Sequence, residues 1–461
     1  MNRRKFLGKT GPRWASWVLI ATAGCAGSHE QQVQRNLREV REAGRTGSAE
    51  REQLPELEGS LDAYVKYAML RSPALRASFE QWHAATERIS PQRRLPEPTV
   101  SYTYFVRNVE TRVGPQEHKL GIQQKFPWPT KLTAGAEAQS DEAEAARERF
   151  EAQALALEAE VEQLYWRLWA VHRVHDVFNE QEGVLETLEQ TVKARVETGQ
   201  ASLADLMQVQ LALTRHRDHH GTHMQMIRRM SADLVATIGA PSGTPTPIHT
   251  DGPRPGLPAM DEAELREAAL AHPRVEAYEY LAQSSDAQVE GEQAERFPSF
   301  GVGLDWVLTG EARGAAAPQD SGKDAVMLTV SASVPLWGES YSDAMDAAEA
   351  EAAAHRASGD AAARAAEAEL EEALSKVRDA QRRIALYSGT LIPQAEAVHE
   401  ALRGDYQTGR TDLAQLLMSE RELLELRDVL VDARADHAIA WAHLEGVVGR
   451  EIPRREAGGD E

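Results

Sequence analysis

The densest group of histidines in this sequence lies at residues 215–226. His216, His220 and His223 follow one another at steps of four and three, so a helix would place the three imidazoles on one face. Imidazole nitrogens can hold soft or borderline metal ions. However, Gly221 would loosen this turn, and three ligands on one helix rarely complete a site alone. The segment is a candidate for transient metal contact, and histidines hydrogen-bonded between packed helices are the alternative.

The only cysteine of the chain is Cys25, which excludes an internal disulfide and a cysteine metal cluster. A basic head and the apolar segment 14–23 precede it, as in an export signal. The four residues that end at Cys25, Thr-Ala-Gly-Cys, resemble a lipobox, in which the cysteine becomes lipidated. We expect residues 1–25 to be a signal peptide with Cys25 as the lipid anchor, exported by the general or the twin-arginine route. An incidental cysteine in a cleaved signal is the alternative.

The sequence contains none of the common motifs of enzyme active sites. It has no Gly-rich phosphate loop, no His-Glu-x-x-His and no Gly-x-Ser-x-Gly. Its formal net charge is −21, and loss of the basic signal would make the mature chain more acidic. This charge argues against nucleic acid as a partner. We therefore expect no enzymatic activity and no cofactor.

The histidines belong to a long helical pattern. No proline occurs between Pro129 and Pro241, and apolar residues recur at steps of three and four, as in a coiled coil. The pattern predicts a helix over 130–198, about 100 Å long. A reversal at Thr198-Gly199 and a return helix over 203–239 follow.

The same construction occurs a second time. A long helix is predicted over 338–408, a reversal at Thr408-Gly409 and a return helix over 411–448. Matching positions are separated by 200 to 210 residues, far more than in a solenoid repeat. The chain is therefore predicted to be a duplicated module.

Each long helix is preceded by segments that alternate apolar with small or polar residues, at about 98–127 and 298–335. Strict alternation over about ten residues is typical of a membrane β-strand. The two hairpins supply four strands, whereas the smallest single-chain barrels have about eight. Several chains must then contribute, and three copies would supply twelve strands. An ordinary sheet packed on helices is the alternative.

The remaining boundaries follow from composition. We expect a polar, extended tether over 26–59, a first repeat over 60–240 that opens with a helix, and a Pro/Gly linker over 241–260. The second repeat is expected over 261–450, followed by a disordered tail over 451–461.

In this order of elements, the chain resembles the TolC-type outer-membrane efflux proteins over about residues 60–450. The resemblance rests on the duplicated hairpins, on Leu-Arg-Ser-Pro-Ala-Leu-Arg at 70–76 and on Ala-His-Pro-Arg-Val at 271–275. Residues 124–132, Gln-Lys-Phe-Pro-Trp-Pro-Thr-Lys-Leu, are similar to the lipoprotein members paired with heavy-metal efflux pumps. The resemblance implies a mainly α fold with a small β part. Three chains would form an α-helical barrel continuous with a membrane β-barrel of twelve strands, four from each chain.

The resemblance also implies where the working residues lie. The two reversals, Thr198-Gly199 and Thr408-Gly409, would form the periplasmic tip and gate of the tunnel. Family members carry acidic residues shortly after the tip glycine, and Asp205 matches that position. The second copy departs from the pattern, with Asp412 as a possible substitute. Three copies of Asp205 would make a ring that favours cations, whereas a helix-start aspartate favoured by the helix dipole is the alternative.

The implied function is an outer-membrane exit duct of a tripartite efflux system, which conducts small toxic solutes, with metal cations as the preferred cargo. Its partners would be two further copies of this chain, a periplasmic adaptor, an inner-membrane pump and outer-membrane lipid. The protein would be lipid-anchored, inserted as a barrel and extended into the periplasm. The alternatives are a duct for type I protein secretion and a periplasmic coiled-coil lipoprotein that acts as a structural spacer.

Overall fold

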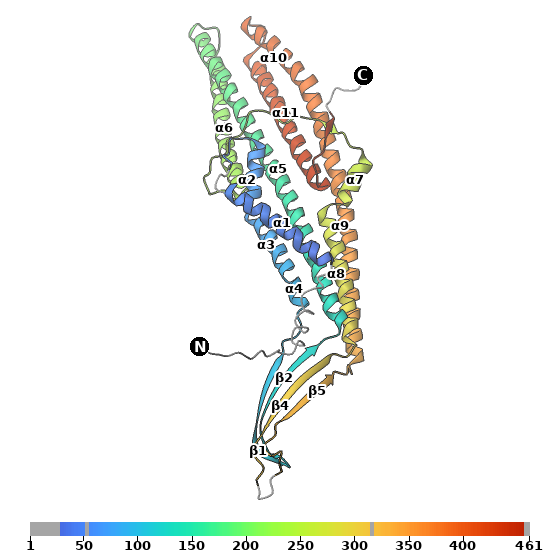
Figure 1. The fold of residues 1–461 in the computed structure, drawn as a ribbon. Helices are drawn as coiled ribbons and strands as arrows, with labels where there is room; N and C mark the ends of the chain where they lie inside the picture. The colour runs from blue at the N-terminus through green and yellow to red at the C-terminus, as the bar shows by residue number, and fades with distance from the viewer. Residues whose placement is uncertain (1–27, 51–54, 314–317, 456–461) are drawn as a thin grey trace, which may run out of the picture.

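The computed structural model describes residues 28–50, 55–313 and 318–455, and for residues 42–50 it describes the backbone only. The molecule is elongated, with a small sheet at one end and two long helical hairpins that run away from it (Figure 1). The hairpins lie side by side near the sheet, and residues at their far ends share one apolar cluster. The export signal and lipobox predicted over residues 1–25 lie outside the described residues.

The two repeats contain corresponding elements in the same order. The first comprises α2 (Leu61–Arg71), α3 (Pro73–Glu87), α4 (Ile89–Gln92), β1 (Thr99–Thr111), β2 (Gly114–Phe126), α5 (Pro129–Glu197) and α6 (Leu203–Thr237). The second comprises α7 (Glu262–Leu270), α8 (Pro273–Glu295), β4 (Phe300–Thr309), β5 (Ala325–Ala332), α9 (Gly338–Leu386), the π-helix η1 (Tyr387–Leu391), α10 (Ile392–Gln407) and α11 (Leu413–Val448). The short strands β3 (Leu257–Pro258) and β6 (Arg454–Arg455) form a separate pair.

The helix α5 begins with Pro129, whose fixed φ and missing N–H suit a first helical position. It then runs for 69 residues, which corresponds to about 104 Å. Its apolar stripe is buried, including Leu157, Val161 and Leu168. With α2, α3 and α6, this stripe forms the core of the first repeat.

The second long helix differs from the predicted uninterrupted helix over 338–408. A π-helical turn at residues 387–391 separates α9 from α10, and Pro393 follows directly. Proline has no N–H to donate to the carbonyl four residues back, and its ring crowds that carbonyl. A wide π turn accommodates this defect without ending the helix.

Small residues allow the two repeats to pack closely near the sheet. α5 buries Ala134, Ala136 and Ala138 there, and Ser284 of α8 donates a hydrogen bond to the Ala138 carbonyl at 2.8 Å. Further from the sheet, the second repeat has its own core around Trp441 and Leu374. The helical part is therefore a wall of packed hairpins with one core in each repeat.

The predicted extended tether over 26–59 is wrong for much of its length, because residues 28–50 form the helix α1 (Ser28–Glu50). Its Val33 and Leu37 are buried. Val33 packs in one cluster with residues of α3, α4 and α5. Val33 and Leu37 are four residues apart and therefore lie on one face of the helix.

The predicted disordered tail over 451–461 is wrong at its beginning. Ile452 is buried in the core of the second repeat, and β6 pairs with β3. The guanidinium of Arg454 lies 4.3 Å from the ring centre of Trp441. These contacts hold residues 452–455 against the helices, whereas 456–461 lie outside the described part of the chain.

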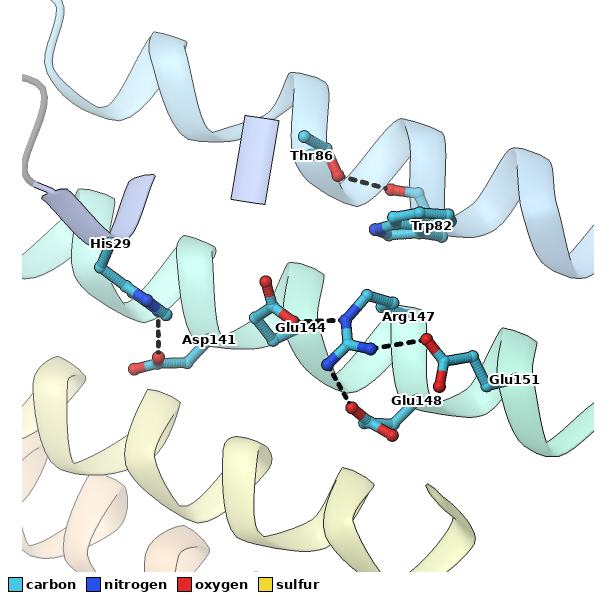
Figure 2. Close-up of polar contacts among 8 residues, drawn as sticks. All are labelled: His29, Trp82, Thr86, Asp141, Glu144, Arg147, Glu148 and Glu151. Carbon is cyan, nitrogen blue, oxygen red and sulfur yellow. Dashed lines mark hydrogen bonds and ion pairs between the residues drawn. The ribbon is translucent and has the colours of Figure 1, made fainter. Parts of the chain in front are cut away.

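A cluster of carboxylates surrounds Arg147 on the part of α5 that is near the sheet (Figure 2). Arg147 donates to Glu144 at 2.6 Å, to Glu151 at 2.5 Å and to Glu148. Both Glu144 and Glu148 are almost fully buried. Burial raises the pKa of Glu148 to about 7, although Arg147 lowers it. One guanidinium thus neutralises a carboxylate cluster that would otherwise disfavour folding.

Two polar contacts connect α1 to the rest of the chain. Nε2 of His29 lies 3.0 Å from Oδ1 of Asp141 on α5. Oε2 of Glu30 lies 2.8 Å from Nε of Arg93. The start of α1 is therefore attached to the part of the helical wall that is near the sheet.

We expect Arg147→Met to destabilise the protein by about 3 kcal/mol, because it leaves buried carboxylates without their cation. Arg421→Met is the matched control, since Arg421 pairs with Glu425 on an exposed surface. An exposed pair of this kind contributes less than about 1 kcal/mol. Urea unfolding followed by circular dichroism measures both variants. Equal midpoints for the two would contradict a stabilising role for Arg147.

The stability should also fall as pH rises towards 7. Burial, followed by the charges of Glu445 and Glu158, raises the pKa of Glu162 to about 7. Glu148 behaves similarly. A carboxyl whose pKa is higher in the folded state binds a proton on folding, so its contribution to stability is lost as pH rises from about 4.5 to 7.

Thermal unfolding between pH 5 and pH 8 tests this dependence. Glu162→Gln should flatten the profile, whereas Glu160→Gln, on the exposed face of the same helix, should not. A profile that is unchanged by Glu162→Gln would show that this carboxyl does not titrate in this range.

Candidate functional site

The four long strands form one antiparallel sheet in the order β1-β2-β4-β5. The pair β2–β4 joins the two repeats. In the chain as described, β1 and β5 each have one unpaired edge. The N–H and C=O groups on such edges are free to pair with further strands.

The central part of one face of the sheet is apolar and exposed. The strand register aligns its side chains into rows that cross all four strands. The two central rows are Val100, Ile122, Leu304 and Leu328, and Tyr102, Leu120, Trp306 and Val326. Each of these eight side chains is at least 41% exposed, and Val100 reaches 73%. No described segment covers this face, so it requires an apolar environment outside the chain.

The opposite face carries mostly small and polar side chains, with Val307 and Met327 as apolar exceptions. The row between the two central ones contains Ser101, Gly121, Asp305 and Met327. The ammonium group of Lys119 lies 3.1 Å from Oδ1 of Asp305. Thr329 donates to the same carboxylate. The two faces of the sheet therefore differ in polarity, as the alternation of its sequence predicts.

The first predicted reversal lies at the far end of the α5–α6 hairpin. Gly199 has a φ of +72°, a conformation that side chains other than glycine rarely adopt. Its N–H donates to the carbonyl of Val196, and that of Gln200 to the carbonyl of Arg195. The hydroxyl of Thr198 donates to the Ala194 carbonyl at 3.2 Å. These bonds satisfy the last carbonyls of α5.

The second reversal has the same construction. Gly409 has a φ of +74°, and the hydroxyl of Thr408 donates to the carbonyl of Gly404 at 3.2 Å. The two Thr-Gly pairs therefore perform one local function, which is to end a long helix and turn the chain back.

The two candidate aspartates both cap helices. The backbone N–H of Ser202 donates to Oδ2 of Asp205 at 2.8 Å, and the Asp205 N–H donates to the Ser202 hydroxyl, which forms a capping box. Asp412 is the N-cap of α11 and accepts from the N–H of Gln415 at 2.9 Å. Asp412 thus takes the place of Ser202 in the second repeat, and Gln415 that of Asp205. The structure does not make Asp412 equivalent to Asp205.

Arg195 connects the two tips, and sequence reasoning missed it. From the last turn of α5, its guanidinium donates to the carbonyls of Tyr406 at 3.3 Å and Gln407 at 3.0 Å, at the end of α10. It also lies 4.9 Å from the centre of the Tyr406 ring. A cation at a helix C-terminus offsets the negative end of the helix dipole. The only sequence signal was a basic residue in a last turn, which does not reveal its partner.

A small apolar cluster accompanies this contact. It comprises Val192, Val209, Tyr406, Leu413 and Leu416, from both repeats. The two hairpin ends are therefore packed against each other within one chain.

The three candidate histidines are engaged separately. Nε2 of His216, which is buried, lies 2.8 Å from the carbonyl oxygen of Phe178. Nε2 of His220 lies 3.1 Å from Oδ1 of Asn179. The ring of His223 lies 4.7 Å from the Phe178 ring. Within the described residues, no group of three or more His, Cys, Asp or Glu side chains is arranged to hold a metal ion. The packing interpretation of this segment therefore accounts for its pattern better than the metal interpretation.

Among the described residues, no helix is both long enough and apolar enough to cross a membrane.

Comparison with known proteins identifies the family. The model of the family described as "Outer membrane efflux protein" matches residues 64–240 and 265–450. No curated protein matches the chain.

Solved structures share the fold. CusC, whose crystal structures concern folding and transmembrane channel formation, is 16% identical with a TM-score of 0.71 and covers 85% of this chain and 92% of its own. The outer-membrane channel OprN is 20% identical with a TM-score of 0.69 and covers 85% and 90%. VceC, an outer membrane protein of Vibrio cholerae, is 18% identical with a TM-score of 0.69 and covers 85% and 96%.

At these identities the structural likeness shows the fold alone, whereas the family model matches well over half of the chain. The expected resemblance and the mainly α fold with a small β part are confirmed. The chain belongs to the outer membrane efflux protein family, whose members are channels and not enzymes.

Proposed function

We propose that three copies of this chain form the outer-membrane exit duct of a tripartite efflux system. The observation that carries this proposal is the exposed apolar face of the four-stranded sheet. A sheet in lipid must satisfy its backbone groups internally, which requires closure into a barrel. Three sheets joined through the free edges of β1 and β5 would close twelve strands.

The helical hairpins support the same assembly. α5 is about 104 Å long and starts directly at the end of β2. Three copies would continue the barrel as a wall of helices into the periplasm, where the tips would dock on a periplasmic adaptor and an inner-membrane pump. Solutes would then pass passively from the pump to the exterior.

The position of α1 supports Cys25 as a lipid anchor. α1 starts three residues after Cys25, and its His29 contacts Asp141. Asp141 lies twelve residues beyond Pro129, the first residue of α5, which corresponds to about 18 Å along the helix from the sheet. A lipid on Cys25 would therefore reach the membrane surface that the sheet crosses.

We further propose that Asp205 contributes to cation selectivity at the tip. Both hydrogen bonds that Ser202 donates to the Asp205 carboxylate end on one oxygen, Oδ2. The carboxylate can therefore cap the helix and still contribute its charge to a ring. Asp205 is also only half-buried in the single chain. Three such carboxylates around a narrow opening would favour cations.

Single-channel conductance in a planar bilayer across a salt gradient tests the duct and its filter. We expect the purified trimer to give cation-selective steps, and Asp205→Asn to weaken the selectivity because it removes three charges. Glu197→Gln, an exposed carboxylate at the end of α5, is the control.

The outcomes of this measurement distinguish the duct, the filter and the structural spacer. Conductance that ignores Asp205→Asn would retain the duct and discard the filter. A folded trimer that does not insert would favour the structural spacer.

Metal cations are the cargo that we propose, on the similarity of residues 124–132 to members paired with heavy-metal pumps and on the acidic balance of the chain. In a strain that lacks this gene, the intact gene should restore growth in the presence of toxic metal salts.

A gene that carries Trp306→Asp, placed on the apolar face, is the control and should not restore growth. Rescue that is restricted to organic compounds would exclude metals as cargo, and rescue that is restricted to a secreted protein would favour the secretion duct.

A further inference from the structure

A pocket lies where the first-repeat helices α5 and α6 meet α11 of the second repeat. Its volume is about 340 Å³, which falls in the range of small-molecule sites. The residues of its lining that matter most are Val171, Val174, His223, Met230, Asp428 and Asp432. It is separate from the sheet and from the hairpin tips.

The lining of this pocket is divided by chemistry. α5 and α6 contribute mainly apolar side chains, including Val171, Val174 and Met230. α11 contributes Asp428 and Asp432, which are four residues apart and therefore share one helix face. The pocket thus offers an apolar wall opposite a row of carboxylates.

Two polar atoms of this pocket have no partner. Oδ1 of Asp428 and Nδ1 of His223 are both buried and make no hydrogen bond within the described residues. Leaving a buried polar atom unsatisfied destabilises the folded state, and more so for a charged group. A ligand that offers a positive charge or an N–H donor would remove this cost.

The charges around Asp428 are mostly negative. Burial, followed by the charges of Asp432 and Glu425, raises the pKa of Asp428 to about 7. Burial and the neighbouring histidines lower the pKa of His223, which keeps its ring neutral at neutral pH.

Two cations belong to the surroundings of this pocket. A guanidinium nitrogen of Arg383 on α9 lies 2.9 Å from Oδ2 of Asp436, so this cation is paired with Asp436 and not with Asp428. Arg167 of α5 lines the pocket but is exposed to solvent. The carboxylate of Asp428 therefore lacks a cation of its own.

We propose that this pocket binds a hydrophobic organic cation, with the charged group against Asp428 and the apolar body against Val171, Val174 and Met230. The volume and the apolar wall suit an organic body better than a bare metal ion, for which the described residues supply no group of three or more His, Cys, Asp or Glu ligands. The site goes beyond the proposed duct, because it requires neither conduction nor a particular cargo.

A matched series of adamantyl compounds tests this site by isothermal titration calorimetry on the purified full-length protein. At neutral pH, 1-adamantylamine is a cation, 1-adamantanol is neutral and 1-adamantanecarboxylate is an anion. We expect only the amine to bind with measurable affinity. Asp428→Asn should weaken its binding by roughly tenfold or more, since it removes a charge-assisted contact. Asp218→Asn, on the exposed face of α6, is the control and should bind as the parent does.

The pH dependence separates the carboxylate contact from general partition into an apolar pocket. The amine stays protonated between pH 6 and pH 8, whereas Asp428 loses its proton in this range. Binding should therefore tighten by about tenfold from pH 6 to pH 8, because the ionised fraction of a group with a pKa near 7 rises by that factor. The Asp428→Asn variant should show no such change. This variant should fold, because it relieves repulsion from Asp432 and Glu425.

Several outcomes would overturn the proposal. Equal binding of the amine and the alcohol, or of the parent and Asp428→Asn, would exclude a cation site at Asp428. Binding of Ag⁺ without binding of the amine would reassign the pocket to a metal ion. Failure of this site leaves the bilayer measurement unaffected, and a protein that binds the amine but does not conduct would lose only the proposed duct.

Discussion

The constraint on which the structure depends is its small sheet, which exposes an apolar face and has unpaired backbone groups at both edges. The apolar face needs an apolar environment, and the edges need further strands. Lipid accepts the apolar face but not unpaired backbone groups, and four strands cannot close on themselves. One chain is therefore an incomplete object, and the trimer that we propose follows from this. The pair β2–β4 is the central connection, because it joins the strands of the two repeats into a single sheet whose apolar rows run without interruption.

The helical part resolves a different constraint. A helix of about 100 Å cannot be buried in a globular core, so each hairpin has only a narrow apolar stripe. Close packing near the sheet is achieved by alanine and serine on α5 and α8. Buried carboxylates on α5 are tolerated because Arg147 neutralises several of them at once. Similar local devices end both long helices, since Gly199 and Gly409 adopt the same left-handed conformation.

The duplication is not exact, and the differences between the repeats lie at defined places. The second long helix contains a π turn before Pro393, whereas α5 is uninterrupted. The capping box at Ser202 and Asp205 becomes a single cap at Asp412. Asp428 and its neighbours on α11 face the first repeat at a pocket in the seam between the two hairpins. Because each repeat presents different side chains at this seam, the duplicated module can carry sites that neither copy has alone.

The sequence by itself determined the periodic features of this protein, because they depend on local chemistry. Alternation predicted the two-faced strands, steps of three and four predicted the long helices, and Thr-Gly predicted both reversals. It did not determine contacts between distant segments. The composition around Val33 predicted an extended tether, whereas this segment is a helix whose Val33 packs against α3, α4 and α5. Likewise, the partner of Arg195 lies more than 200 residues away in the sequence. The buried oxygen of Asp428 has no hydrogen-bond partner because none of the helices that surround it supplies a donor. Such features arise from tertiary packing, which no local pattern records.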